Sequence, residues 1–168
     1  NGGNSMSKVI TVAQQKGGAG KTTLAAHIAV ALSQKGNRVA VVDIDPQGSL
    51  SKLVNTFSEQ AGREPEHVIG RADFKSYADL AGLLEPYDIA IIDTPPYLSD
   101  ELEAVFAISN LILVPCKASP LDFLAIGDTL DLIRRSRDKR PELLAAIVLT
   151  MTITGTDFTT SIRRELEK

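Results

Sequence analysis

Short apolar runs alternate with amphipathic segments along this chain, and turn residues separate them. Five runs carry almost no alternation of polar and apolar positions, as expected for parallel strands that helices cover on both faces. They span residues 8–13, 38–43, 87–93, 111–115 and 145–150. Apolar residues at helical spacing predict helices over residues 24–36, 49–61, 74–84, 100–109, 121–136 and 157–167. The order predicts an α/β fold, a doubly wound and mostly parallel sheet flanked by helices.

Polar or glycine-rich segments follow four of the predicted strands. They are QQKGGAGKTT from Gln14, DIDPQ from Asp43, DTPP from Asp93 and PCKASP from Pro115. In a doubly wound sheet, ligands bind outside the carboxyl ends of the strands. We therefore expect these four segments to form one site.

The glycine-rich segment has the composition of a phosphate-binding loop. Three glycines let backbone N–H groups turn toward a phosphate, and the following helix start adds a positive dipole end. Gln15 stands where the general pattern has its first glycine. A turn with only a structural role is the alternative, although GKTT opens a helix directly after a strand. The expected nucleotide-binding residues are Lys16, Gly17, Gly18, Ala19, Gly20, Lys21, Thr22 and Thr23.

Length and composition favour one globular domain. The chain has 168 residues, 43% of them hydrophobic, and no apolar run approaches the roughly 18 residues of a membrane span. With a single cysteine, Cys116, an internal disulfide is excluded, and we expect a cytoplasmic protein. The small polar residues 1–5 indicate a cloning remnant ahead of a natural start at Met6, so the domain is expected to span residues 6–168.

The net charge of −3 conceals a basic stretch. The segment RRSRDKR holds five basic residues and one acidic residue at the end of a predicted helix. Two interpretations stay open: cations that interact with the helix dipole, or a patch that contacts DNA phosphates without reading bases. The candidate DNA-binding residues are Arg134, Arg135, Arg137, Lys139 and Arg140, extended by Arg163 and Arg164.

The string QQKGGAGKTT resembles the deviant Walker A loop of the ParA/MinD family of P-loop ATPases, with Lys16 at the position of the signature lysine. Three further blocks, VVDIDPQGSLS, YDIAIIDTPP and LILVPCKASPLDFLA, are similar to the family's later motifs in the same order. Together the blocks extend over nearly the whole chain. DPQGS and the PxxxSPLD pattern resemble the ParA/Soj type of partition ATPase, in its small form without an N-terminal DNA-binding domain.

The resemblance implies ATP and Mg²⁺ as cofactors and a role for each polar residue. Asp93 closes an apolar strand and is the expected acid that holds the hydrated metal, with capping of a helix as the alternative. Thr22 is the expected direct magnesium ligand, and Asp43 supports the metal, like Asp93, through water. Lys21 binds phosphate as a catalytic residue, and Asp45 orients the attacking water. Turn formation before Pro46 is the alternative for the two aspartates of DIDPQ.

Lys16 implies a homodimer that forms when ATP is bound. In the resembled family the signature lysine is catalytic and reaches across the dimer to the partner's phosphates. Slow hydrolysis to ADP and phosphate then undoes the dimer, so the protein is expected to be a switch. Family members usually continue through further C-terminal elements, and we expect this chain to lack them.

The implied function is plasmid or chromosome partition, with a ParB-like adaptor and non-specific binding to nucleoid DNA in the ATP state. A positioning ATPase for another cargo, of the MinD, chemotaxis-cluster or carboxysome type, is the first alternative. A biosynthetic synthase that uses ATP is the second. No stable membrane association is expected. His27 and His67 lack metal-ligand spacing, and one cysteine per subunit excludes a cluster held by two.

Overall fold

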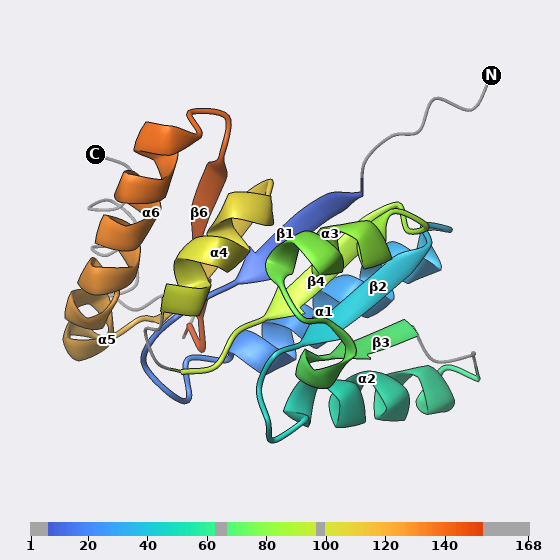
Figure 1. Cartoon of the computed structure of the whole chain (residues 1–168). Coiled ribbons are helices and arrows are strands. Elements are labelled where there is room, and N and C mark those ends of the chain that lie inside the picture. The colour runs from blue at the N-terminus through green and yellow to red at the C-terminus, as the bar shows by residue number, and fades with distance from the viewer. Residues whose placement is uncertain (1–6, 63–66, 97–99, 153–168) are drawn as a thin grey trace.

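The computed structural model describes residues 7–62, 67–96 and 100–152 of the chain (Figure 1). Six strands form the sheet: β1 (Lys8–Val12), β2 (Val39–Asp43), β3 (His67–Gly70), β4 (Ile89–Asp93), β5 (Leu111–Lys117) and β6 (Leu144–Thr150). The α-helices are α1 (Lys21–Gln34), α2 (Ser49–Gln60), α3 (Tyr77–Leu84), α4 (Asp100–Ile108), α5 (Pro120–Ala125) and α6 (Gly127–Lys139). A short 3-10 helix, η1 (Arg71–Asp73), follows β3.

The strands lie in the order β3-β2-β4-β1-β5-β6, and every neighbouring pair is parallel. This confirms the predicted doubly wound sheet. The chain starts in the middle at β1, builds β2, β3 and β4 on one side, and then adds β5 and β6 on the other. The switch in winding direction opens a crevice at the carboxyl end of β1, where such folds bind ligands.

Helices cover both faces of the sheet (Figure 1). On one face, α1 and α2 pack through Ala26, Ala29 and Val54 against side chains such as Val41. On the other face, α3, α4 and α6 cover two clusters, one centred on Leu80 and Ile92 and one on Phe106 and Ile112. The central strands are thus buried on both faces, which explains their unbroken apolar runs.

Two elements differ from the sequence prediction. Strand β3 was not predicted, because this edge strand has only two apolar residues, Val68 and Ile69, between His67 and a glycine. The helix predicted over residues 121–136 is two helices, α5 and α6, which meet at Ile126 immediately before Gly127. Glycine is a poor helix former, so a break at this place is physically reasonable. The predicted helix over 157–167 lies outside the described residues.

Within residues 7–62, 67–96 and 100–152, no helix combines the length and the apolar character needed to cross a membrane.

Candidate functional site

The phosphate loop joins β1 to α1 at the carboxyl edge of the sheet, as expected. Gly18 and Gly20 have φ of 73° and 87°, a left-handed conformation that side chains with a Cβ rarely adopt. Gly20 is the N-cap of α1, so the helix starts with Lys21 and Thr22 immediately after the turn. The loop therefore places the N-terminus of α1 and the side chain of Lys21 at the same site.

Neighbouring strands hold this loop in position. Thr150 at the end of β6 donates a hydrogen bond from its Oγ1 to the carbonyl of Ala19, at 3.0 Å. The buried amide of Gln14 donates to the carbonyl of Pro115 at 3.4 Å and accepts a bond from Thr129 Oγ1 at 3.4 Å. The loop is thus fixed before any ligand arrives, which lowers the entropy lost on binding.

Two buried carboxylates lie side by side next to the loop. Asp43 and Asp93 are the last residues of β2 and β4 and are register partners in the sheet. Asp93 Oδ2 accepts a hydrogen bond from Thr22 Oγ1 at 2.6 Å. Asp43 Oδ2 accepts two bonds from Ser51 at the start of α2, from its backbone N and its Oγ, both at 3.0 Å. The next described helix, α4, begins at Asp100, seven residues after Asp93, so Asp93 is not its N-cap.

The remaining carboxylate oxygens fit a magnesium site. Oδ1 of Asp43 and Oδ1 of Asp93 are buried and have no hydrogen-bond partner within the described residues. No group of three His, Cys, Asp or Glu side chains close enough to hold a metal is found in the same residues. Magnesium matches this pattern, because it keeps several waters and takes only one or two carboxylates alongside phosphate oxygens. Thr22, Asp93 and Asp43 are therefore placed to hold it.

Burial and neighbouring charges shift the pKa values of Asp93 and Lys21. Burial raises the pKa of Asp93 to about 6, opposed by the hydrogen bond from Thr22 and the charge of Lys21. Burial also lowers the pKa of Lys21, while Asp93 and Asp45 oppose that shift. Lys21 and Asp93 therefore stabilise each other in the charged form, whereas the charges of Asp43 and Asp45 disfavour ionisation of Asp93. A metal cation bound beside these carboxylates would offset that repulsion.

Asp45 lies in the turn that follows β2. Its Oδ1 accepts a hydrogen bond from the backbone N of Gln47 at 2.9 Å, so the side chain does stabilise the turn around Pro46. Its charge nevertheless acts on both Lys21 and Asp93. The water-orienting role expected for Asp45 stays a prediction.

The two lysines of the loop have different surroundings. Lys21 is 8% exposed and faces the carboxylate cluster. The Lys16 side chain is 43% exposed, and its Nζ lies 3.0 Å from Oδ1 of Asp122 on α5. Ser119 Oγ donates to the other oxygen of Asp122 at 2.5 Å, and this bond, followed by that from Lys16, lowers the pKa of the carboxyl. Because its pKa is lowered, Asp122 is ionised and serves as the anionic partner of Lys16.

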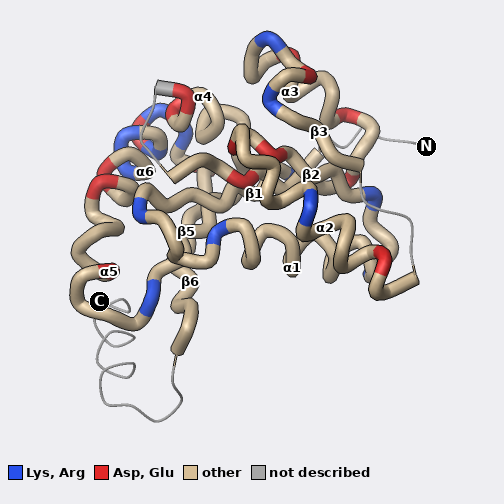
Figure 2. The backbone as a smooth tube through the Cα atoms, turned by 90° about the horizontal axis from the view of Figure 1, so that it is seen from below, with Lys and Arg blue, Asp and Glu red and all other residues tan. Residues whose placement is uncertain are grey.

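The basic stretch lies on the C-terminal half of α6 and directly after it, whereas the acidic Asp128 and Asp131 lie earlier on the same helix (Figure 2). Arg134 pairs with Asp131 at 2.6 Å, and Lys139 approaches Glu103 of α4 at 3.8 Å. Arg135 and Arg137 are exposed, and within the described residues neither has an ion-pair partner. Arg163 and Arg164 lie outside these residues.

Arg140 has a structural role. Its Nη1 donates to the carbonyls of Phe106 at 3.2 Å and Ser109 at 2.9 Å, and also to that of Ala107. These are carbonyl groups at the C-terminal end of α4, which lack partners inside the helix. The guanidinium therefore caps α4 with a charge that suits the helix dipole.

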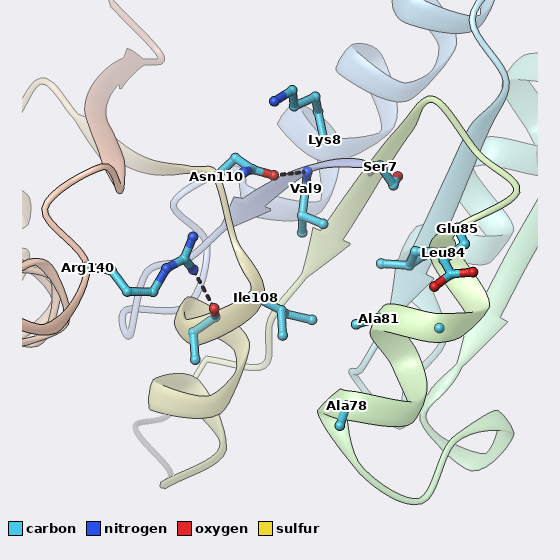
Figure 3. Close-up of a pocket in the computed structure, with 12 residues that line it drawn as sticks. Ser7, Lys8, Val9, Ala78, Ala81, Leu84, Glu85, Ile108, Asn110 and Arg140 are labelled. Carbon is cyan, nitrogen blue, oxygen red and sulfur yellow. Dashed lines mark hydrogen bonds between the residues drawn. The ribbon is translucent and has the colours of Figure 1, made fainter. Parts of the chain in front are cut away.

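A hollow of about 510 Å³ lies at the opposite edge of the sheet, between α3 and α4 (Figure 3). Ala78 and Ala81 of α3 line one side, and Ile108 of α4 lies across from them. Two of its polar side chains are engaged, since Asn110 accepts a bond from the backbone N of Val9 at 2.8 Å and Arg140 caps α4. The hydroxyl of Ser7, which also lines the hollow, is buried without a hydrogen-bond partner among the described residues. We assign no ligand to this hollow.

Several contacts of the site lacked a sequence signal. Asp122 and Ser51 fall inside the quoted blocks, but nothing in their spacing indicated that they bind Lys16 and Asp43. Thr150 follows an apolar run without any motif. Cys116 is buried, as expected for a structural thiol, and burial raises its pKa.

The parallel sheet, the glycine loop at the start of α1 and the adjoining carboxylates define a P-loop nucleotide-binding domain. A family model described as CobQ/CobB/MinD/ParA nucleotide binding domain matches residues 10–167. The chain belongs to this family. The expected class is thereby confirmed: the domain is an ATPase of the ParA/MinD kind, with ATP and magnesium as its cofactors.

Two curated proteins and one solved structure illustrate the relationship. Maintenance of carboxysome distribution protein A of Halothiobacillus neapolitanus is 34% identical over 161 residues, which cover 95% of this chain and 73% of that protein. The chromosome-partitioning ATPase Soj of Thermus thermophilus is 29% identical over 168 residues, with coverage of 83% and 68%. Cobyrinic acid a,c-diamide synthase of Mycobacterium smegmatis, solved with ADP and magnesium, has a TM-score of 0.78 at 23% identity over 96% of this chain and 81% of that one.

Proposed function

We propose that this protein is a switch ATPase that dimerises when it binds ATP and positions a cargo over DNA. The observation that carries the proposal is the contrast between the two lysines of the loop. Lys21 is buried beside the carboxylates that serve its own site, whereas Lys16 is exposed and bound to α5. A lysine at the surface can reach a second subunit once it leaves its partner Asp122.

The surface around Lys16 supports a dimer. Leu121 and Leu124 of α5 flank Asp122 in sequence and are 73% and 75% exposed. In the proposed dimer Asp122 loses its partner Lys16. Exposed leucines beside such a charge are typical of a surface that is covered in an assembly. ATP at two facing loops would bring this surface of each subunit together.

The chemistry expected at each loop is transfer of the γ-phosphoryl group to water. Lys21 and the N-terminus of α1 stabilise the phosphate charge. When bound, magnesium would neutralise negative charge on the phosphates. Thr22, Asp93 and Asp43 orient its ligands, and Asp45 positions the attacking water. Because no arginine lies in the loop, Lys16 of the other subunit supplies the additional charge, and the monomer alone hydrolyses ATP slowly.

For the cargo, we favour a protein assembly such as a carboxysome. The support is the 34% identity over 95% of this chain to a carboxysome distribution protein. Partition of a plasmid or chromosome with a ParB-like adaptor is the second candidate, favoured by the DPQGS block and by the similarity to Soj. The gene beside this one discriminates between them: a cargo protein favours the first, and a small DNA-binding adaptor with a basic tail favours the second.

The test of the switch is the mass of the full-length protein in solution with magnesium and either ATP or ADP, measured by light scattering. We expect a dimer with ATP and a monomer with ADP. Lys21→Ala should abolish nucleotide binding. Lys16→Ala should bind nucleotide and remain a monomer without hydrolysis. A wild-type protein that stays monomeric with saturating ATP would contradict the proposal.

Association with DNA is tested separately. The ATP-bound protein should be retained on DNA of arbitrary sequence and released as salt rises, because phosphate contacts dominate such binding. ADP should abolish retention. Equal retention with ATP and ADP would show that the switch does not control DNA binding. No retention with ATP would favour the biosynthetic alternative instead.

A further inference from the structure

A lysine with no assigned role lies beside the phosphate loop. Lys117 is the last residue of β5. A Cβ placed on Gly18 would lie 3.7 Å from the Nζ of Lys117. The ammonium group is therefore next to the loop backbone, at the turn whose N–H groups are expected to face phosphate.

The fold explains why Lys117 reaches this place. β5 pairs directly with β1, which leads into the loop, so the carboxyl end of β5 lies alongside it. Thr150, the register partner of Lys117 on β6, also contacts the loop through its bond to the carbonyl of Ala19. The ends of two neighbouring strands thus form one side wall of the phosphate loop.

Among the residues that the structure describes, Lys117 has no counter-charge of its own. It is half-buried, and within the described residues its ammonium makes no hydrogen bond or ion pair. The charge of Lys117 contributes to the low pKa of the Asp122 carboxyl, but Lys16 and Ser119 already occupy the oxygens of that carboxylate. A half-buried ammonium without a partner carries a desolvation cost, and an anion bound at the loop would offset that cost.

We propose that Lys117 binds the phosphate chain of the nucleotide in its own subunit, as a second lysine beside Lys21. A lysine suits this role, because its ammonium acts as a point charge on a flexible stem and needs no fixed donor geometry. The inference rests on the proposed function only in that a nucleotide occupies the loop. It adds that the monomer holds its nucleotide with two lysines of its own, without the Lys16 of a partner.

The test compares Lys117→Met with Lys35→Met in the full-length protein. Lys35 is exposed and lies at the far end of α1, so its variant removes the same charge far from the loop. The probe is a fluorescent ADP analogue with magnesium, which does not depend on dimerisation. We expect Lys117→Met to raise the Kd about tenfold, the loss typical of one charge-assisted hydrogen bond. Lys35→Met should leave the Kd unchanged.

Two further measurements separate charge from packing. Lys117→Arg should restore most of the affinity, and the salt dependence of ADP binding should be shallower for Lys117→Met than for the wild type. Thermal unfolding without nucleotide verifies that each variant is folded. An unchanged Kd for folded Lys117→Met, or an arginine variant as weak as the methionine variant, overturns the inference while the proposed function stands. A wild-type protein that binds no nucleotide overturns both.

Discussion

The Nζ of Lys16 lies 3.0 Å from Oδ1 of Asp122, so the signature lysine of the loop is bound within its own subunit. For Lys16 to reach another subunit, this pair has to break. The Lys16 side chain is 43% exposed and that of Asp122 is 11% exposed, so water weakens the pair only in part. In the proposed dimer, breaking this pair would therefore cost a modest amount of free energy.

The first prediction concerns the free-energy cost of breaking the pair between Lys16 and Asp122. Asp122→Asn removes the charge that holds Lys16, and we expect dimerisation at a roughly threefold lower protein concentration in the presence of ATP. Sedimentation across a concentration series measures this shift. Asp128→Asn is the matched control, because Asp128 is exposed on the neighbouring α6 and has no ion-pair partner within the described residues. Equal midpoints for both variants would show that the pair does not restrain Lys16.

The second prediction separates the two roles of Asp45. Asp45→Ala should bind ATP, lose hydrolysis by at least about a hundredfold, and remain a dimer. Asp45→Asn keeps an oxygen that can accept the bond from Gln47 N, so it preserves the turn but not the charge. We expect it to hydrolyse ATP as poorly as the alanine variant. Wild-type turnover by Asp45→Asn would mean that the turn is the only contribution of this residue.

The third prediction concerns pH and Asp93. Burial raises the pKa of this carboxyl from 3.8 to about 6, so the folded protein binds more protons than the unfolded chain between these values. Above pH 6 the ionised group therefore lowers the free energy of unfolding, by about 3 kcal/mol, and this destabilisation disappears as the pH falls toward 4.

Asp93→Asn removes that destabilisation and also removes a carboxylate proposed to hold magnesium. We expect the variant to be more stable than the wild type at pH 8, with the two approaching each other at pH 4, while magnesium-dependent hydrolysis is lost throughout. Urea unfolding at a series of pH values, without nucleotide or metal, measures the difference. A difference in unfolding free energy that does not depend on pH would refute the role of ionisation.

The fourth prediction concerns the members of the basic stretch that are free to contact DNA, in contrast to those with a structural role. Arg135 and Arg137 are exposed and lack ion-pair partners within the described residues, so they are the members of the stretch best placed to contact DNA. The double alanine variant should weaken ATP-dependent retention on DNA and make it less sensitive to salt, with stability unchanged. Wild-type retention at every salt concentration would remove these two arginines from the DNA surface.

Arg140 is expected to behave in the opposite way, which is the fifth prediction. Arg140→Ala leaves carbonyl groups at the end of α4 without their charged donor, and we expect the unfolding free energy to fall by about 2 kcal/mol. Chemical denaturation measures this loss. Arg140→Lys keeps the charge but not the several donors, so an intermediate stability is expected. A fully stable alanine variant would show that water replaces the cap.

The sequence predicted the location of a site residue where that location follows from the residue's position at the end of a strand. Asp43 and Asp93 end apolar runs, and parallel strands bring their carboxyl ends to one edge, so their proximity was predictable. The partners of Lys16 and Arg140 were not, because each contact joins segments that only the complete fold brings together. β3 was missed for another reason: two apolar residues on an edge strand are too few to show a pattern.

The register between β2 and β4 has a consequence for folding. Asp43 stands opposite Asp93, and both are the last residues of their strands. If either strand slipped by one residue, a carboxylate would lie opposite an isoleucine or a valine and lose Ser51 or Thr22 as its hydrogen-bond donor. Burying an unpaired charge is far costlier than misplacing an aliphatic side chain. Asp43 and Asp93, which we propose hold magnesium, therefore also specify the register of the sheet. They make misaligned pairings unfavourable among strands whose valines and isoleucines are nearly interchangeable.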